Sequence, residues 1–290
     1  MSTQITTAFV EQYSSNVSML AQQMGSKLRG SVDVETVRGN HAFFDQIGVT
    51  AAVARTTRHG ATPQVNTPHS RRRVSLADYE WADLVDDLDK VRMLVDPTSS
   101  YAKAAAAAMN RSIDDIVIAA MNAAASTGVA GATSTALPST SKFATTQQTD
   151  GLTLAKLLSA KHFFDAGDVD PSIKRYIVCG AKQIQDLLNT TEIKNSDFNT
   201  VKALAQGDIN SFLGFEFIMS NRLAFDATNT DDRLCFAYTQ DAVKLAIGAD
   251  VKAKISERDD KSYATQVYYS MALGATRMEE SKVFQIPCDE

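Results

Sequence analysis

The sequence predicts an α+β protein. Residues Thr98 to Ser126 contain no helix breaker and indicate one long helix, and helical and strand patterns mix on both sides of it. Three segments near the C-terminus, at residues 252–257, 263–278 and 282–286, have the pattern of long strands. Mixed helices and strands around one long helix are typical of the α+β class.

Length and composition exclude several classes of protein. The chain has 290 residues, of which 44% are hydrophobic and 22% charged, which is enough for one large core or two modest cores. Its formal net charge of -5 excludes a protein that holds DNA over its whole surface. The three cysteines are far apart and form no Cys-x-x-Cys pair, which predicts neither a disulfide framework nor a zinc cluster. No apolar run is long enough to span a bilayer.

The start of the chain carries one apolar stripe, whose large side chains recur every three or four positions. The stripe consists of Phe9, Tyr13, Val17, Leu20, Met24 and Leu28. Its only bases, Lys27 and Arg29, lie at its end, so it has no basic face suited to a membrane surface. We expect a helix that docks on the rest of the subunit or on a neighbour.

A long loop between two strands follows. Residues 49–55 are partly β-branched, and residues 73–76 alternate as a strand does. The tip between them, Thr56 to Arg72, contains two prolines and few large apolar side chains. Because such a tip cannot build a core of its own, we expect it to reach across another part of the molecule or another subunit.

Charges of opposite sign are grouped along this region. No acid occurs between Asp45 and Asp78, whereas the following stretch is strongly acidic. Isolated charge runs are usually solvated surface, and that alternative stays open. The favoured interpretation is that the basic tip lies over equivalent acids of the next subunit in a ring. The candidate intersubunit contacts are Arg55, Arg58, Arg71, Arg72, Arg73, Asp83, Asp86, Asp87 and Asp89.

The long helix begins after Asp96 and Pro97, residue types suited to the N-cap and to the first helical position. An apolar stripe from Met109 to Ala124 marks its buried face. Residues 125–150 are mostly small and polar, which predicts a loose segment and a boundary. Beyond it we expect helices at 152–166, 184–188 and 242–247, and strands at 176–179, 213–219 and 233–238.

The sequence contains no signature of catalysis. It lacks a phosphate-binding loop, a dinucleotide fingerprint, a nucleophile elbow and a His-Glu-x-x-His helix. His41 and Asp45 alone would leave the coordination sphere of a metal mostly empty. Asp114 and Asp115, adjacent on a helix, point in different directions and form no carboxylate dyad. We therefore expect no catalytic residue, no metal site and no cofactor.

Several segments, taken in order, are similar to one known family. They are Asp86 to Tyr101, Asn110 to Asp115, Phe212 to Ser220, Ala242 to Ile247, and Gly274 to Arg277. Together with the order of helix, loop, long helix and closing strands, they resemble the major capsid protein of tailed double-stranded DNA phages, with its Hong Kong 97-type fold. The resemblance covers nearly the whole chain.

The resemblance implies five parts of the chain. They are an N-terminal helix or arm at 1–30, an extended β-hairpin loop at 31–82, a peripheral domain with the spine helix at 83–150, an axial α/β domain at 151–250, and closing strands of the peripheral domain at 251–290. The implied function is self-assembly, through hexamers and pentamers, into an icosahedral shell. This shell is expected to form in the host cytoplasm, to become part of the virion, and to enclose double-stranded DNA without sequence-specific binding and without contact with a membrane.

Two features of the chain modify these expectations. Some members of the family join subunits by an isopeptide bond from a lysine of the loop, but no lysine lies between Lys27 and Lys90. A non-covalent shell is therefore expected. The loop starts near residue 31, which leaves no room for a long N-terminal scaffolding segment, so we expect a separate scaffolding protein and a portal. A decoration protein is left open.

Two alternatives stay open at this point. An encapsulin, a bacterial compartment for cargo proteins, resembles the same fold and differs in what fills the shell. An α+β enzyme with an unrecognised site is less favoured, and it predicts a small oligomer with a well-formed pocket.

Overall fold

The computed structural model describes residues 22–85, 98–143, 150–189, 211–227 and 229–290. Its mixture of helices and strands confirms the predicted α+β class. The chain divides into two compact units, each described by itself below. Among the described residues, the first unit comprises 22–25, 78–85, 98–111 and 249–271, and the second comprises all others. The predicted boundaries at residues 30, 82, 150 and 250 concern roles in a shell and stay predictions.

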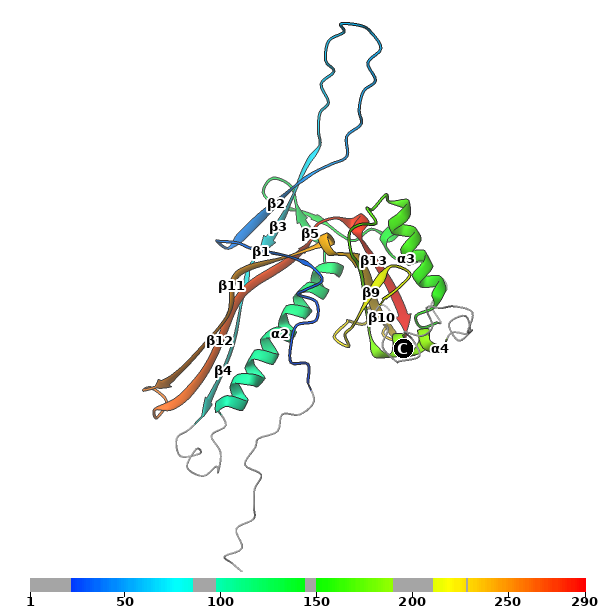
Figure 1. The fold of residues 1–290 in the computed structure, drawn as a ribbon. Helices are drawn as coiled ribbons and strands as arrows, with labels where there is room; N and C mark the ends of the chain where they lie inside the picture. Colours follow the sequence, from blue (N-terminus) through cyan, green and yellow to red (C-terminus); the bar gives the residue numbers. More distant parts are fainter. Residues whose placement is uncertain (1–21, 86–97, 144–149, 190–210, 228) are drawn as a thin grey trace, which may run out of the picture. The chain divides into compact units, whose positions relative to one another are not determined.

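The first unit contains one end of a sheet and half of the long helix. Its elements are most of β4 (Ala77–Val85), the outer part of β11 (Val243–Arg258), the start of β12 (Ala264–Arg277) and the first half of α2 (Thr98–Asn122). Along β4 the exposed and half-buried side chains alternate, as expected for a strand with one covered face. β11, β12 and β4 are neighbours in the sheet order β1-β11-β12-β4 (Figure 1).

The second unit contains a five-stranded sheet in the order β13-β10-β7-β9-β8. The strands are β7 (Arg175–Cys179), β8 (Ser211–Phe212), β9 (Phe215–Met219), β10 (Asp232–Thr239) and β13 (Val283–Asp289). Two helices accompany them, α3 (Leu154–Ala166) and α4 (Ala181–Asn189). Every residue of β7 is buried, because this strand is paired on both sides within the sheet.

A four-stranded sheet in the order β2-β3-β5-β6 also belongs to the second unit. Its strands are β2 (His41–Ile47), β3 (His69–Ser75), β5 (Ala125–Thr127) and β6 (Thr133–Thr135). The short β1 (Asp33–Thr36) pairs in parallel with the start of β11. Three single 3-10 turns, η2 (Ser139–Ser141), η4 (Gln240–Ala242) and η5 (Glu280–Lys282), link these elements. Phe44, Val74, Ala246 and Met278 form a core cluster.

Several predicted elements are confirmed and others are wrong. Residues 242–247 were expected to be helical, but Val243 to Ile247 form the start of β11, because pairing with β1 holds them extended. Residues 125–143 are not loose, since β5 and β6 form a hairpin that extends the sheet beyond β3. This pairing also ends α2 at Asn122, before the expected Ser126.

The loop and the start of the chain also differ from expectation. The first strand of the loop is His41–Ile47, and residues 49–55 lie in the exposed tip without a strand partner. Of the predicted N-terminal helix, residues 1–21 lie outside the described residues, and residues 22–30 form bends and turns instead of a helix. Among the described residues, no helix is both long and apolar enough to cross a membrane.

Candidate intersubunit surface

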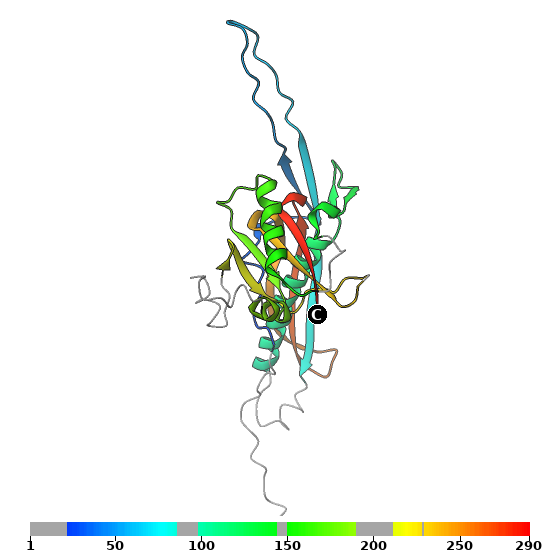
Figure 2. The ribbon, with the colours of Figure 1, turned by 90° about the vertical axis from the view of Figure 1, so that its right-hand side faces the viewer.

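The loop between β2 and β3 has no core of its own. Residues 47–70 are all exposed, among them Val49 at 97%, Val53 at 59% and Val65 at 46%. The Gly48 amide donates to the Pro68 carbonyl at 2.8 Å and closes the base of the loop. Beyond this point the two arms run away from their sheet as irregular chain (Figures 1 and 2). These valines therefore gain no burial within the subunit.

Two of the candidate arginines lie at the end of the loop. Arg55 donates from Nε to the carbonyl of Thr57 at 3.0 Å, and Arg58 is exposed nearby in sequence. His59, the next residue, has a φ of 63°, which reverses the chain together with the Gly60 to Thr57 hydrogen bond. The tip therefore carries two positive charges at its turn.

Arg71 lies on β3, and its ion pair is within the subunit. Its guanidinium donates to both carboxylate oxygens of Asp45, at 2.5 and 3.2 Å, and lies over the ring of Phe43 at 5.4 Å from the centroid. The Arg71 hydrogen bond lowers the pKa of Asp45 below its usual value. Both groups are exposed, and an intersubunit role for Arg71 stays a prediction.

Arg72 lies in the interior of the subunit, which corrects its prediction as a surface contact. The residue is only 7% exposed, and it donates from Nε to the Met278 carbonyl at 2.8 Å. Its Nη2 binds both carboxylate oxygens of Glu280, at 2.9 and 2.7 Å. The physical reason is the period of the strand, which turns alternate side chains of the triplet inward.

Arg73 supports the turn between β5 and β6. Its Nη1 donates to the Ala130 carbonyl at 3.3 Å. Gly131, with a φ of 66°, leaves the space that the arginine stem fills, because a Cβ there would come within 2.5 Å of the Arg73 Cβ. Arg73 is half-buried, so much of its contribution is within the subunit.

Another buried arginine, Arg277, was not among the residues predicted from the sequence. Arg277 is fully buried and donates to the carbonyls of Met121, Ala123 and Thr135, at 2.8 to 3.0 Å. Burial lowers its pKa, and Glu280 at 3.7 Å opposes that effect. It satisfies carbonyls at the end of α2, where a helix leaves acceptors unpaired. The burial pattern of β12 does not alternate regularly near Arg277, so strand periodicity alone did not indicate that this side chain is buried.

The candidate acids are described only in part. Asp83 is half-buried on β4, in the first unit, and its Oδ1 accepts from the Leu84 amide at 2.8 Å. Asp86, Asp87 and Asp89 lie outside the described residues. The proposed pairing of the tip with these acids therefore stays a prediction.

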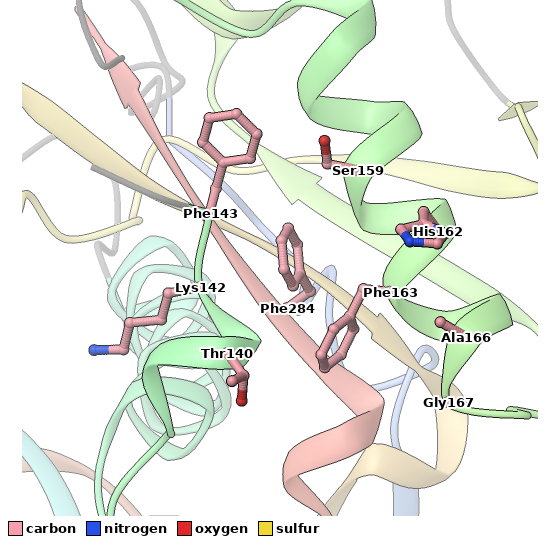
Figure 3. A pocket seen from close by; sticks show the side chains of 9 residues that line it. All are labelled: Thr140, Lys142, Phe143, Ser159, His162, Phe163, Ala166, Gly167 and Phe284. Carbon is pink, nitrogen blue, oxygen red and sulfur yellow. The ribbon is translucent and has the colours of Figure 1, made fainter. Parts of the chain in front are cut away.

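An aromatic groove of the second unit lacks a catalytic arrangement. It has a volume of about 560 Å³ and lies between α3, β13 and residues 140–143 (Figure 3). The Phe163 and Phe284 rings, with centroids 4.9 Å apart, form much of its wall. Ser159 donates its hydroxyl to the Ala155 carbonyl at 2.9 Å, so His162 in the same groove does not activate it. Among the described residues, no group of three His, Cys, Asp or Glu side chains is suited to a metal ion.

Solved capsid structures are similar to this chain over nearly its whole length. The capsid of cyanophage P-SCSP1u matches with a TM-score of 0.75 at 17% identity, covering 99% of this chain and 94% of that chain. The capsid of Ralstonia phage GP4 matches with a TM-score of 0.74 at 10% identity, covering 97% and 95%. A chain of Mycobacterium phage Che8 matches with a TM-score of 0.69 at 17% identity, covering 96% and 97%. These similarities show a shared fold.

Similarity in sequence identifies the family. None of the curated proteins matches the chain. A family model described as phage capsid protein matches residues 5–290. This match favours neither the encapsulin nor the enzyme alternative, and it agrees with the fold and with the exposed loop. The chain therefore belongs to the phage capsid protein family and is a structural, non-enzymatic major capsid protein of the virion shell, with the Hong Kong 97-type fold.

Proposed function

We propose that this capsid protein assembles through hexamers and pentamers into an icosahedral shell around double-stranded DNA, without covalent links between subunits. The observation that carries the proposal is the loop between β2 and β3, whose residues 47–70 are exposed throughout. Apolar side chains such as Val49 gain a buried environment only when another chain covers them. A closed shell supplies that cover for every subunit.

The positive charge of the loop favours an acidic surface as its partner. Arg55 and Arg58 extend positive charge to the tip, and the acidic stretch Asp83, Asp86, Asp87 and Asp89 of a neighbouring copy is the proposed counterpart. Arg71 and Arg73 contribute at the base of the loop, whereas Arg72 acts within the subunit. Such complementary charges fix the register of a contact and speed association more than they add affinity.

The remaining parts of the proposal follow from the family resemblance. Residues 83–150 and 251–290 form the peripheral domain, and residues 151–250 form the axial domain near the symmetry axes. A separate scaffolding protein and a portal take part in assembly in the host cytoplasm. The net charge of -5 supports a wall that encloses DNA without holding it tightly.

Electron microscopy of the purified protein, alone and co-expressed with a candidate scaffolding protein, tests assembly directly. The variant R55E/R58E should give folded subunits with few closed shells, and the charge-conserving control R55K/R58K should close normally. Reversal of Asp86 and Asp87 to Lys in the R55E/R58E background should restore closure. Normal shells from R55E/R58E would contradict the charge contact, and absence of shells from the unmodified protein under all these conditions would contradict assembly itself.

Denaturing gel electrophoresis tests the non-covalent character of the shell. The loop contains no lysine, because none occurs between Lys27 and Lys90. Mature shells should therefore dissociate into a single band at the subunit mass of 31.4 kDa. A ladder of covalent multimers would show that another residue supplies a crosslink.

A further inference from the structure

A buried carboxylate in the middle of α2 binds the segment that precedes β1. Asp114 is fully buried, and its Oδ1 accepts from the Ser26 hydroxyl at 2.6 Å. The Lys27 amide donates to both carboxylate oxygens at 3.1 Å, and the Leu28 amide donates to Oδ1 at 3.1 Å. One side chain of the helix therefore holds three consecutive residues of a segment more than eighty positions away.

Further contacts secure the same segment within the second unit. The hydroxyl groups of Ser31 and Tyr238 lie 2.5 Å apart, and Ser31 also donates to the Leu28 carbonyl at 2.8 Å. Leu28, Ser31 and Val32 are at most 3% exposed. Lys27 reaches the Met219 carbonyl with its ammonium group at 2.7 Å. The segment is thus packed and bonded on several sides.

The chemistry of the Asp114 contact makes partial release unfavourable. A buried carboxylate is costly unless donors surround it, and buried amide groups are costly unless they find acceptors. If residues 26–28 moved away from the helix, the Asp114 carboxylate and the backbone amides of Lys27 and Leu28 would lose their hydrogen-bond partners at the same time. The attached arrangement is therefore favoured as a unit. Within the first unit, Arg111 and Asn110 of α2 also bind residues 22–24, at 2.8 to 3.2 Å, so the contact with Asp114 continues along the helix.

We propose that Asp114 is a positioning residue that fixes residues 26–28 on α2 and thereby sets the direction of the N-terminal segment that precedes them. The sequence ahead of this anchor carries the apolar stripe of Phe9, Tyr13, Val17 and Leu20. Because residues 26–28 are fixed on α2, the surfaces that the apolar stripe can reach are limited. This restriction contributes to regular assembly. The anchor itself is a property of one subunit and does not depend on the proposed loop contact.

Limited trypsin digestion of unassembled subunits tests the anchor. No Lys or Arg precedes Lys27, so cleavage after Lys27 or Arg29 releases one N-terminal fragment of known mass. In the unmodified protein these bonds should be cut slowly. In Asp114→Ala they should be cut about 10- to 100-fold faster, the loss expected for hydrogen bonds to a charged group. Cleavage after the exposed Arg55 and Arg58 is the internal standard and should not change.

A neighbouring acid provides the matched control. Asp115 is exposed and pairs with Arg222, so Asp115→Ala should leave cleavage after Lys27 and Arg29 unchanged. Ser26→Ala removes one of the donors to Asp114, together with the hydroxyl that accepts from the Arg29 amide at 3.1 Å, and should give an intermediate rate. This variant keeps the test decisive if Asp114→Ala fails to fold. Asp114→Asn, which retains one acceptor oxygen, should also be intermediate.

The outcomes separate the anchor from assembly. The proposal would be overturned if Asp114→Ala folds and is cleaved at the rate of the unmodified protein. It would also be overturned if Asp115→Ala is cleaved as fast as Asp114→Ala. If Asp114→Ala does not fold, an unchanged cleavage rate in Ser26→Ala would overturn it. Because the digestion uses unassembled subunits, it gives its answer whether or not closed shells form. Electron microscopy of Asp114→Ala should in addition show fewer regular shells than Asp115→Ala.

Discussion

The strand β7 and the loop between β2 and β3 differ in the burial of their side chains and in their pairing with neighbouring segments. All residues of β7 are buried, with β10 on one side and β9 on the other. All residues from 47 to 70 are exposed, and the Gly48 amide donates to the Pro68 carbonyl where the arms leave the β2–β3 pair. The comparison shows that β7 contributes to the core of the subunit, whereas the loop contributes no buried surface to it.

The arginines of the chain also differ between buried and exposed positions. Arg72 and Arg277 are buried and bind carbonyls and Glu280, whereas Arg55 and Arg58 lie on the exposed tip. Reversing the whole Arg71 to Arg73 triplet would therefore disturb folding and surface charge at once. Variants restricted to the tip separate the two effects.

Thiol reactivity should show the largest difference between sheet and loop. Cys179, Cys235 and Cys288 are buried on β7, β10 and β13, and burial raises the pKa of Cys179 to about 12. At pH 8 the loss of thiolate should slow maleimide labelling on the order of 1000-fold relative to the unfolded chain. Mass spectrometry should find no label on the folded protein and three labels after denaturation. Rapid labelling of the folded protein would show that the sheet opens. In Thr57→Cys, a single label should appear at once.

Truncation of a buried arginine should cost more stability than any change in the loop. Arg277→Ala removes three hydrogen bonds to buried or partly buried carbonyls, and it leaves Arg72 as the one remaining arginine beside Glu280 among the described residues. We expect a loss of about 3–5 kcal/mol in the free energy of unfolding, measured by urea denaturation. Arg55→Ala is the control and should change it by less than about 0.5 kcal/mol. Equal effects of the two substitutions would remove the distinction between the regions.

Loop valines should affect assembly without affecting the subunit. Val49→Ser and Val53→Ser remove exposed methyl groups, so the free energy of unfolding should change by less than about 0.5 kcal/mol. The yield of closed shells, measured by sedimentation, should fall, because each contact is repeated in every subunit. A loss of subunit stability, or an unchanged yield of shells, would show that these valines have a different role.

The smallest expected effect concerns the ion pair at the base of the loop. The hydrogen bond from Arg71 lowers the pKa of Asp45, so the pair's stabilisation is present above the usual value of 3.8. It is lost as the pH falls through the lower pKa of the folded state. Titration followed by NMR should show Asp45 returning toward its usual pKa in Arg71→Gln. An unchanged titration would mean that the pair is not formed in solution.

Local signals of the sequence predicted elements whose structure depends on nearby residues. The start of α2 at Thr98 agrees with the sequence signal of Asp96 and Pro97 just before it and the absence of breakers after it. β7 and β10 follow from apolar runs bounded by polar residues. The exposed loop follows from its lack of large apolar side chains.

Elements that depend on distant partners were not predictable in the same way. Val243 to Ile247 alternate as a strand, but Leu245 and Ala246 also suit a helix, and pairing of β11 with its neighbours in the sheet decides between the two. β5 and β6 are short and polar, with Gly128 and Gly131 at positive φ as the one local hint of a hairpin. Their structure follows from pairing with β3.

The sequence by itself determined the class of fold, the long helix, the exposed loop and the resemblance to phage capsid proteins. Only the tertiary structure decided that Arg72 faces Glu280, 208 residues away, and that Asp114 binds the segment before β1. The physical reason is that periodicity and capping are local properties of the chain. The partner of a buried charge, in contrast, is chosen by packing between segments that are far apart in sequence.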